Sequence, residues 1–139
     1  MIRMAVWFLG VVGLTGCLSL AEVRGLPPTR TGEAKGPYLP LAQCVAAKAK
    51  AERLSDIASY AVEDTAVSRT ARVVAMARYP GGLFYTVPTP LFELTVREPE
   101  EGSVKIEARR GPLGASYEPM LWSIVGDCTG GKVTVSPPL

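Results

Sequence analysis

The sequence predicts an α+β fold in which a small antiparallel sheet of three to four strands carries two helices on one face, joined by a disulfide. Two segments that alternate between apolar and polar residues, 91–98 and 103–110, predict the centre of the sheet. Two segments with helical spacing flank them, and each contains one cysteine, Cys44 or Cys128. An all-β sandwich is the alternative fold.

The first 16 residues have the order of a secretory signal peptide. Arg3 gives a positive start, an uncharged apolar run extends from Met4 to Leu14, and small residues follow. A transmembrane helix needs about 20 apolar residues, which is more than this run supplies. We therefore expect residues 1–16 to be a signal peptide and not a membrane span.

The four residues Leu14-Thr15-Gly16-Cys17 resemble the lipobox of bacterial lipoproteins, as found in small Gram-negative envelope lipoproteins. The resemblance implies cleavage before Cys17, a lipid on its thiol and attachment to a membrane through that lipid. Leu18 stands where an aspartate favours retention in the inner membrane, which implies the outer membrane, facing the periplasm. Two or three acyl chains make such an anchor stable.

The segment that follows, residues 17–37, has scattered charge, a Pro-Pro pair and no sustained period. It is interpreted as the lipidated cysteine and a flexible tether, with a single globular domain over residues 38–139. The domain is expected to open with a helix over residues 40–54. An apolar stripe on that helix is formed by Leu41, Cys44, Ala47, Ala51 and Leu54.

Residues 55–79 are ambiguous in their pattern. The shared parity of Ala71, Val73, Ala75 and Ala77 favours a strand over residues 71–79, and a helix over residues 64–77 is the alternative. The sequence Tyr-Pro-Gly-Gly at 79–82 predicts a turn. Because residues 83–90 contain two prolines, they suit an edge segment or a loop better than a central strand.

The alternating segments 91–98 and 103–110 predict a β-hairpin with one buried and one wet face. Phe92, Leu94 and Val96 share the buried face, while Glu93 belongs to the wet face. A helix is expected over residues 119–131, ended by Gly130-Gly131, and residues 132–139 form a short strand or an extended tail.

Cys44 and Cys128 are the thiols that remain once Cys17 is lipidated. An exported chain enters an oxidising compartment, where two such cysteines are expected to form a disulfide. That bridge would join the first helix to the last.

Composition argues against catalysis and against nucleic-acid binding. The chain has no histidine to activate a serine or cysteine, no phosphate-cradling glycine loop and no metal-ligand spacing. Its net charge is only +2, without a basic cluster. We expect no enzyme activity, no cofactor, no metal and no nucleic-acid partner. Glu98, Glu100 and Glu101 crowd a turn, where solvating charge is favoured over a weak calcium site.

The aromatic residues Phe84, Tyr85 and Phe92 lie beside two prolines and suit a partner-binding edge, with core packing as the alternative. The sequence therefore predicts a lipid-anchored, non-catalytic binding or accessory protein of the cell envelope, with a protein partner there. The alternative is an inhibitor or ligand-binding lipoprotein that acts, for example, against a lysozyme-type enzyme or a phage. A hydrolase is less favoured.

Overall fold

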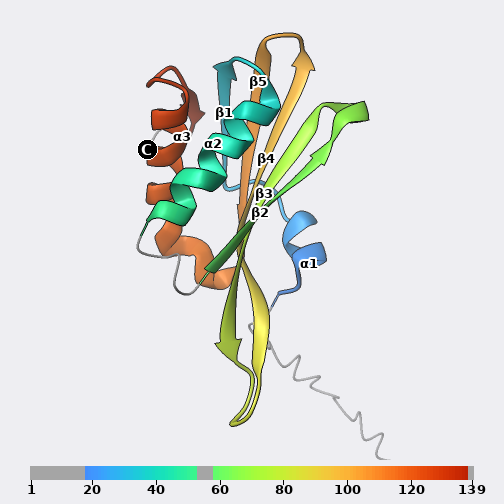
Figure 1. The fold of residues 1–139 in the computed structure, drawn as a ribbon, viewed down its shortest axis with the longest axis vertical. Helices are drawn as coiled ribbons and strands as arrows, with labels where there is room; N and C mark the ends of the chain where they lie inside the picture. Colours follow the sequence, from blue (N-terminus) through green and yellow to red (C-terminus); the bar gives the residue numbers. More distant parts are fainter. Residues whose placement is uncertain (1–17, 53–57, 138–139) are drawn as a thin grey trace, which may run out of the picture.

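One six-stranded antiparallel sheet, in the order β2-β3-β4-β5-β1-β6, organises the computed structural model, which describes residues 18–52 and 58–137 (Figure 1). Helices α2 and α3 cover one face of this sheet, and the short α1 lies on the other. The strands are β1 (Arg30–Lys35), β2 (Ala58–Thr65), β3 (Thr70–Pro80), β4 (Thr86–Glu100), β5 (Ser103–Arg110) and β6 (Thr134–Ser136). The helices are α1 (Leu20–Arg24), α2 (Tyr38–Ala51) and α3 (Glu118–Cys128), with 3₁₀ turns at Ala66–Ser68 and Pro112–Tyr117.

The expected sheet of three to four strands is wrong, and so is the alternative of an all-β sandwich, because one six-stranded sheet carries the helices. The sequence does not predict two of the strands. These are β2, which lies in the ambiguous segment 55–79, and β1, which lies within residues 17–37, interpreted above as a tether. The stability of β1 comes from the backbone, because it pairs with β5 on one side and β6 on the other. The bare Cα of Gly32 also leaves room for the indole of Trp122 against the strand.

The expected hairpin is confirmed, because β4 and β5 pair antiparallel from Phe92↔Arg110 to Glu100↔Ser103. The predicted strand at 71–79 is confirmed as β3, and the alternative helix over 64–77 is wrong. On β3, Ala71, Val73 and Ala75 are fully buried beneath α2, as their shared parity indicates. Helix α3 and the short strand β6 also form where the sequence predicts them.

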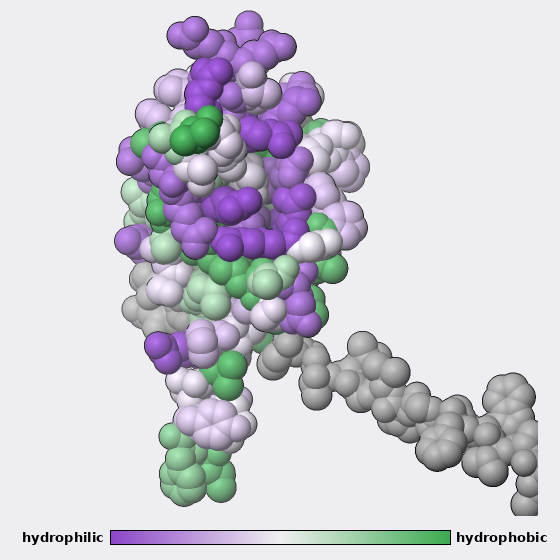
Figure 2. Space-filling view, turned by 90° about the vertical axis from the view of Figure 1, so that its right-hand side faces the viewer, coloured by the Kyte–Doolittle hydropathy of each residue, from purple (hydrophilic) through white to green (hydrophobic). Residues whose placement is uncertain are grey.

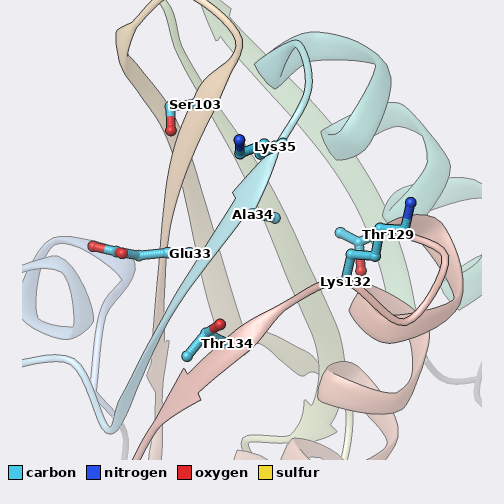
Figure 3. Close-up of a pocket in the computed structure, with 7 residues that line it drawn as sticks. All are labelled: Glu33, Ala34, Lys35, Ser103, Thr129, Lys132 and Thr134. Atoms are coloured by element: carbon cyan, nitrogen blue, oxygen red, sulfur yellow. The ribbon is translucent and has the colours of Figure 1, made fainter.

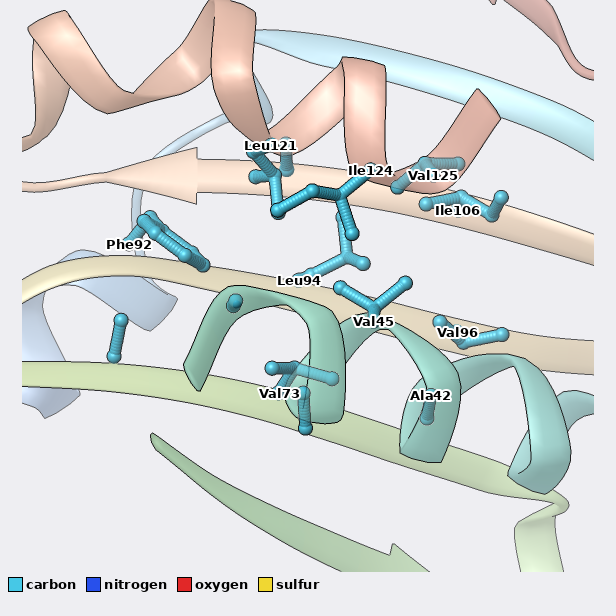
Figure 4. Packing of buried hydrophobic residues seen from close by; sticks show 14 of the residues in the cluster. Ala42, Val45, Val73, Phe92, Leu94, Val96, Ile106, Leu121, Ile124 and Val125 are labelled. Carbon is cyan, nitrogen blue, oxygen red and sulfur yellow. The ribbon is translucent and has the colours of Figure 1, made fainter. Parts of the chain in front are cut away.

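The hydrophobic core lies between the sheet and the pair of helices α2 and α3 (Figure 4). Side chains from both helices point onto the central strands, where every second residue faces them. The larger side chains that are almost completely buried there include Val45, Val73, Leu94, Val96, Ile106, Leu121 and Val125. This packing makes β3, β4 and β5 the centre of the domain.

The buried stripe of α2 differs from the expected one. Leu41, Ala42, Val45, Ala46 and Ala49 are buried, whereas the predicted members Ala47 and Ala51 are exposed. Leu54 lies outside the described residues. Alanines occur on several sides of this helix, so their positions alone do not decide which side faces the sheet. The observed stripe moves Cys44 from the centre of the contact to its half-buried flank.

A disulfide joins Cys44 of α2 to Cys128 of α3, with their Cα atoms 6.0 Å apart, which confirms the expected bridge. The two cysteines are separated by 84 positions in the chain, and the closed loop includes the strands β2 to β5. The bridge therefore restricts the unfolded chain over most of the domain.

Replacing both cysteines, as Cys44→Ala/Cys128→Ala, should lower the free energy of unfolding by about 2–5 kcal/mol, because a long loop is no longer closed in the unfolded chain. Urea unfolding of the oxidised protein and of the variant, followed by circular dichroism, measures this difference. Equal midpoints and slopes would contradict a stabilising role of the bridge.

Candidate functional site: the projecting β3–β4 hairpin

The hairpin formed by β3 and β4 extends beyond the rest of the sheet. β4 begins to pair with β5 at Phe92, whereas residues 86–90 pair with β3 alone. Pro88 and Pro90 therefore lie along an edge that no further strand covers, where the missing N–H of proline is tolerated. This confirms the expected edge segment, and Figure 1 shows the resulting two-stranded ribbon projecting from one end of the domain.

The tip of this hairpin exposes apolar side chains to solvent. Leu83 and Phe84 are 94% and 96% exposed, and Tyr85 is 62% exposed. The ring of Tyr85 lies so close to Gly81 and Gly82 that a Cβ at either glycine would approach it within 3 Å. Figure 2 shows the tip as a hydrophobic end below a largely hydrophilic face. We call Leu83, Phe84 and Tyr85 the apolar tip.

The chain around the apolar tip carries no charge. From Tyr79 to Phe92 no residue is acidic or basic, and the exposed Arg78 comes just before this run. Large exposed apolar residues gathered at one place are typical of an interaction site, whereas single ones are ordinary. The apolar tip is therefore the strongest candidate for a binding surface among the described residues.

Phe84, Tyr85 and Phe92, which the sequence suggests as one partner-binding edge, do not lie together in the structure. Phe84 and Tyr85 lie together at the exposed tip, but Phe92 is 2% exposed in the core, against Tyr60. Phe92 is thus part of the domain's packing and not of an exposed edge. Its parity with Leu94 and Val96 is the sequence signal that separates it from the other two.

The sheet face opposite α2 and α3 is held to α1 by ion pairs. Arg24 Nε donates to Glu93 Oε2 at 2.6 Å, and Arg24 Nη2 donates to Glu63 Oε2 at 2.6 Å. Glu93 is only 1% exposed, and Arg72 Nε lies 3.7 Å from its other oxygen. Sequence reasoning places Glu93 on a wet face and misses this cluster, because its partner Arg24 is 69 positions away in the chain.

Helix α1 is short, and side-chain hydrogen bonds cap its N-terminus. Ser19 Oγ accepts a hydrogen bond from the Glu22 N–H, and the Glu22 carboxylate accepts one from the Ser19 N–H, which forms a capping box. Val23 is fully buried beside Gly111, which lies against Pro90 where the hairpin leaves the sheet. The hydrogen bond to Glu93 raises the pKa of Arg24 above its ordinary value, because it favours the charged guanidinium.

Glu98, expected to be a solvated residue at a turn, is buried instead. Its carboxylate accepts hydrogen bonds from the backbone N–H of Tyr38 and of Gly102, and Arg69 Nη1 lies 3.3 Å from it. These contacts join the start of α2 to the β4–β5 turn. Glu98 therefore has a structural role in this fold.

A hollow of about 490 Å³ lies between β1 and the chain that follows α3 (Figure 3). Its charged residues are Glu33, Lys35 and Lys132. Figure 3 shows the side chains of Glu33 and Lys132 pointing to opposite sides of β1. Their charges do not converge on one point where a ligand could bind. The hollow is therefore a weaker candidate for a binding site than the apolar tip.

Within residues 18–52 and 58–137, no three histidine, cysteine, aspartate or glutamate side chains gather as a metal site. In the same ranges, no helix combines the length and the apolar character needed to cross a bilayer. Cys17 lies outside the described residues. Comparisons of the chain with protein-family models, curated proteins and solved structures return no match.

Replacing Arg24 by alanine should lower the free energy of unfolding by about 1–3 kcal/mol, because a nearly buried carboxylate loses its closest partner. Arg97→Ala is the matched control, since Arg97 is an exposed arginine on the same sheet face and its loss should cost less than about 0.5 kcal/mol. Urea unfolding measures both. Equal losses in the two variants would contradict the role of Arg24 in holding α1.

Proposed function

We propose that this chain is a lipid-anchored binding or accessory protein of the bacterial envelope, non-catalytic, held in the outer membrane and facing the periplasm. The observation that carries the proposal is the apolar tip on its projecting hairpin. Leu83 and Phe84 are almost fully exposed there, at the end of a stretch without charge. Burial of such apolar side chains against a bound surface is favourable, because it removes them from water.

The anchor is supported by the sequence from Met1 to Cys17, which has signal-peptide order and ends in Leu-Thr-Gly-Cys. The Cys44–Cys128 bridge agrees with an oxidising compartment such as the periplasm. Leu18 in place of an aspartate favours the outer membrane. The absence of histidine from the chain supports binding over nucleophilic catalysis.

A second candidate function is inhibition of a soluble enzyme, of the lysozyme type for example, or the blocking of a phage. The observation that favours it is the shape of the hairpin, because a two-stranded ribbon with an apolar end fits a cleft. In this case, substitution of Leu83 or Phe84 would abolish inhibition without unfolding the domain. The two candidates share the same surface and differ in what it contacts.

The anchor is tested by expressing the full chain in a Gram-negative bacterium and determining the mass of its mature N-terminal peptide. We expect the peptide to begin at Cys17 and to carry two or three acyl chains. Cys17→Ser should abolish the acylation, while Cys44→Ser/Cys128→Ser, the matched control, should leave it unchanged. An unmodified Cys17, or a chain that begins at Met1, would refute the proposed anchor.

A further inference from the structure

We propose that the apolar tip inserts into the surface of the same bilayer that holds the lipid anchor, so that the protein contacts its membrane at two points. This inference rests on the proposed function, and it names the bilayer as the partner of the tip. Its basis is the position of α1 beside the root of the hairpin, together with the exposed residues at the hairpin's end.

The first step concerns the distance from Cys17 to the folded domain. Only Leu18 and Ser19 separate Cys17 from the first residue of α1. The chain spans at most about 3.6 Å per residue, so α1 begins within about 11 Å of the Cα of Cys17. Because Val23 and Arg24 fix α1 to the sheet, an acylated Cys17 would hold the domain close to the bilayer surface.

The second step concerns the direction of the hairpin. Val23 of α1 lies beside Gly111, which in turn lies against the backbone of Pro90, where the ribbon begins to project. From Pro90 to Thr86 the extended strand covers about 13 Å, and the turn with the apolar tip lies beyond it. In Figure 1 the described chain begins below α1, and the β3–β4 hairpin extends further toward the same end of the long axis. A bilayer that holds Cys17 is thus within reach of the tip.

The third step concerns the chemistry of the tip. Leu83 and Phe84 are apolar enough to enter the hydrocarbon boundary, and tyrosine is enriched at the level of the lipid headgroups. No carboxylate between Tyr79 and Phe92 opposes contact with anionic lipids, and Arg78 at the start of the run is positioned to approach phosphates. A soluble protein partner would have to reach the tip from the membrane side, so the geometry favours the bilayer.

The test places an indole at the tip of the mature lipoprotein. Phe84→Trp and Val67→Trp are prepared, each at a residue that is at least 96% exposed, and Val67 lies in the separate turn between β2 and β3. Both are reconstituted into vesicles of phosphatidylethanolamine and phosphatidylglycerol that contain brominated lipids. The signal of the buried Trp122, measured in the wild-type protein, is subtracted.

We expect the emission of Phe84→Trp to shift to the blue and to be quenched by the brominated lipids, and that of Val67→Trp to stay unchanged. Leu83→Ser, added to Phe84→Trp, should reduce the quenching, because one inserted side chain is lost. Circular dichroism checks that each variant is folded.

An unquenched indole in Phe84→Trp would overturn the inference, whatever the state of Cys17. If that indole is shielded only after soluble periplasmic protein is added, the partner of the tip is a protein and not the bilayer. The mass of the N-terminal peptide in the same samples reports the anchor separately. Quenching in a sample with unmodified Cys17 would therefore retain the membrane contact and reject the lipid.

Discussion

The ion pair between Arg24 and Glu93 determines how the start of the chain is attached to the domain. Glu93 is almost completely buried, and a buried carboxylate is tolerated only with close cationic or hydrogen-bonding partners. Arg24 supplies the nearest one, and with it α1 is fixed to the sheet. As a consequence, α1 and β1 are part of the folded domain and not of a tether. The position of the start of α1 relative to the hairpin is therefore fixed as well.

The two faces of the sheet have different roles in this arrangement. One face carries the apolar core and the disulfide between α2 and α3, which stabilise the central strands. The other face carries paired charges and α1. The hairpin extends from the end of the sheet where α1 lies, and its apolar tip is unsupported by other elements. A rigid body with a fixed attachment point and one exposed apolar tip is suited to binding in a defined orientation.

Elements whose residue pattern is local can be predicted from the sequence. The alternation at 91–98 and 103–110 predicts the β4–β5 hairpin, and the spacing of Leu121, Ile124 and Val125 predicts α3. Strands β1 and β2 could not be predicted. The strand β1, Arg-Thr-Gly-Glu-Ala-Lys, has few apolar side chains and depends on neighbours distant in the chain. β2 lies in a segment whose pattern is ambiguous. The exposed tip was predicted in part, since Phe84 and Tyr85 lie there and Phe92 does not. The Arg24–Glu93 contact has no local signal.

The most direct test of this account is amide hydrogen exchange at Val23, Gly25 and Thr29 in the wild-type protein. In the structure, the N–H of Val23 is bonded to the Ser19 carbonyl, that of Gly25 to the Ala21 carbonyl, and that of Thr29 to the Ala108 carbonyl. A docked α1 predicts exchange at these amides that is much slower than in an unstructured peptide. Exchange at the unstructured rate would show that residues 18–29 form a loose tether, and the fixed geometry between anchor and hairpin would be wrong.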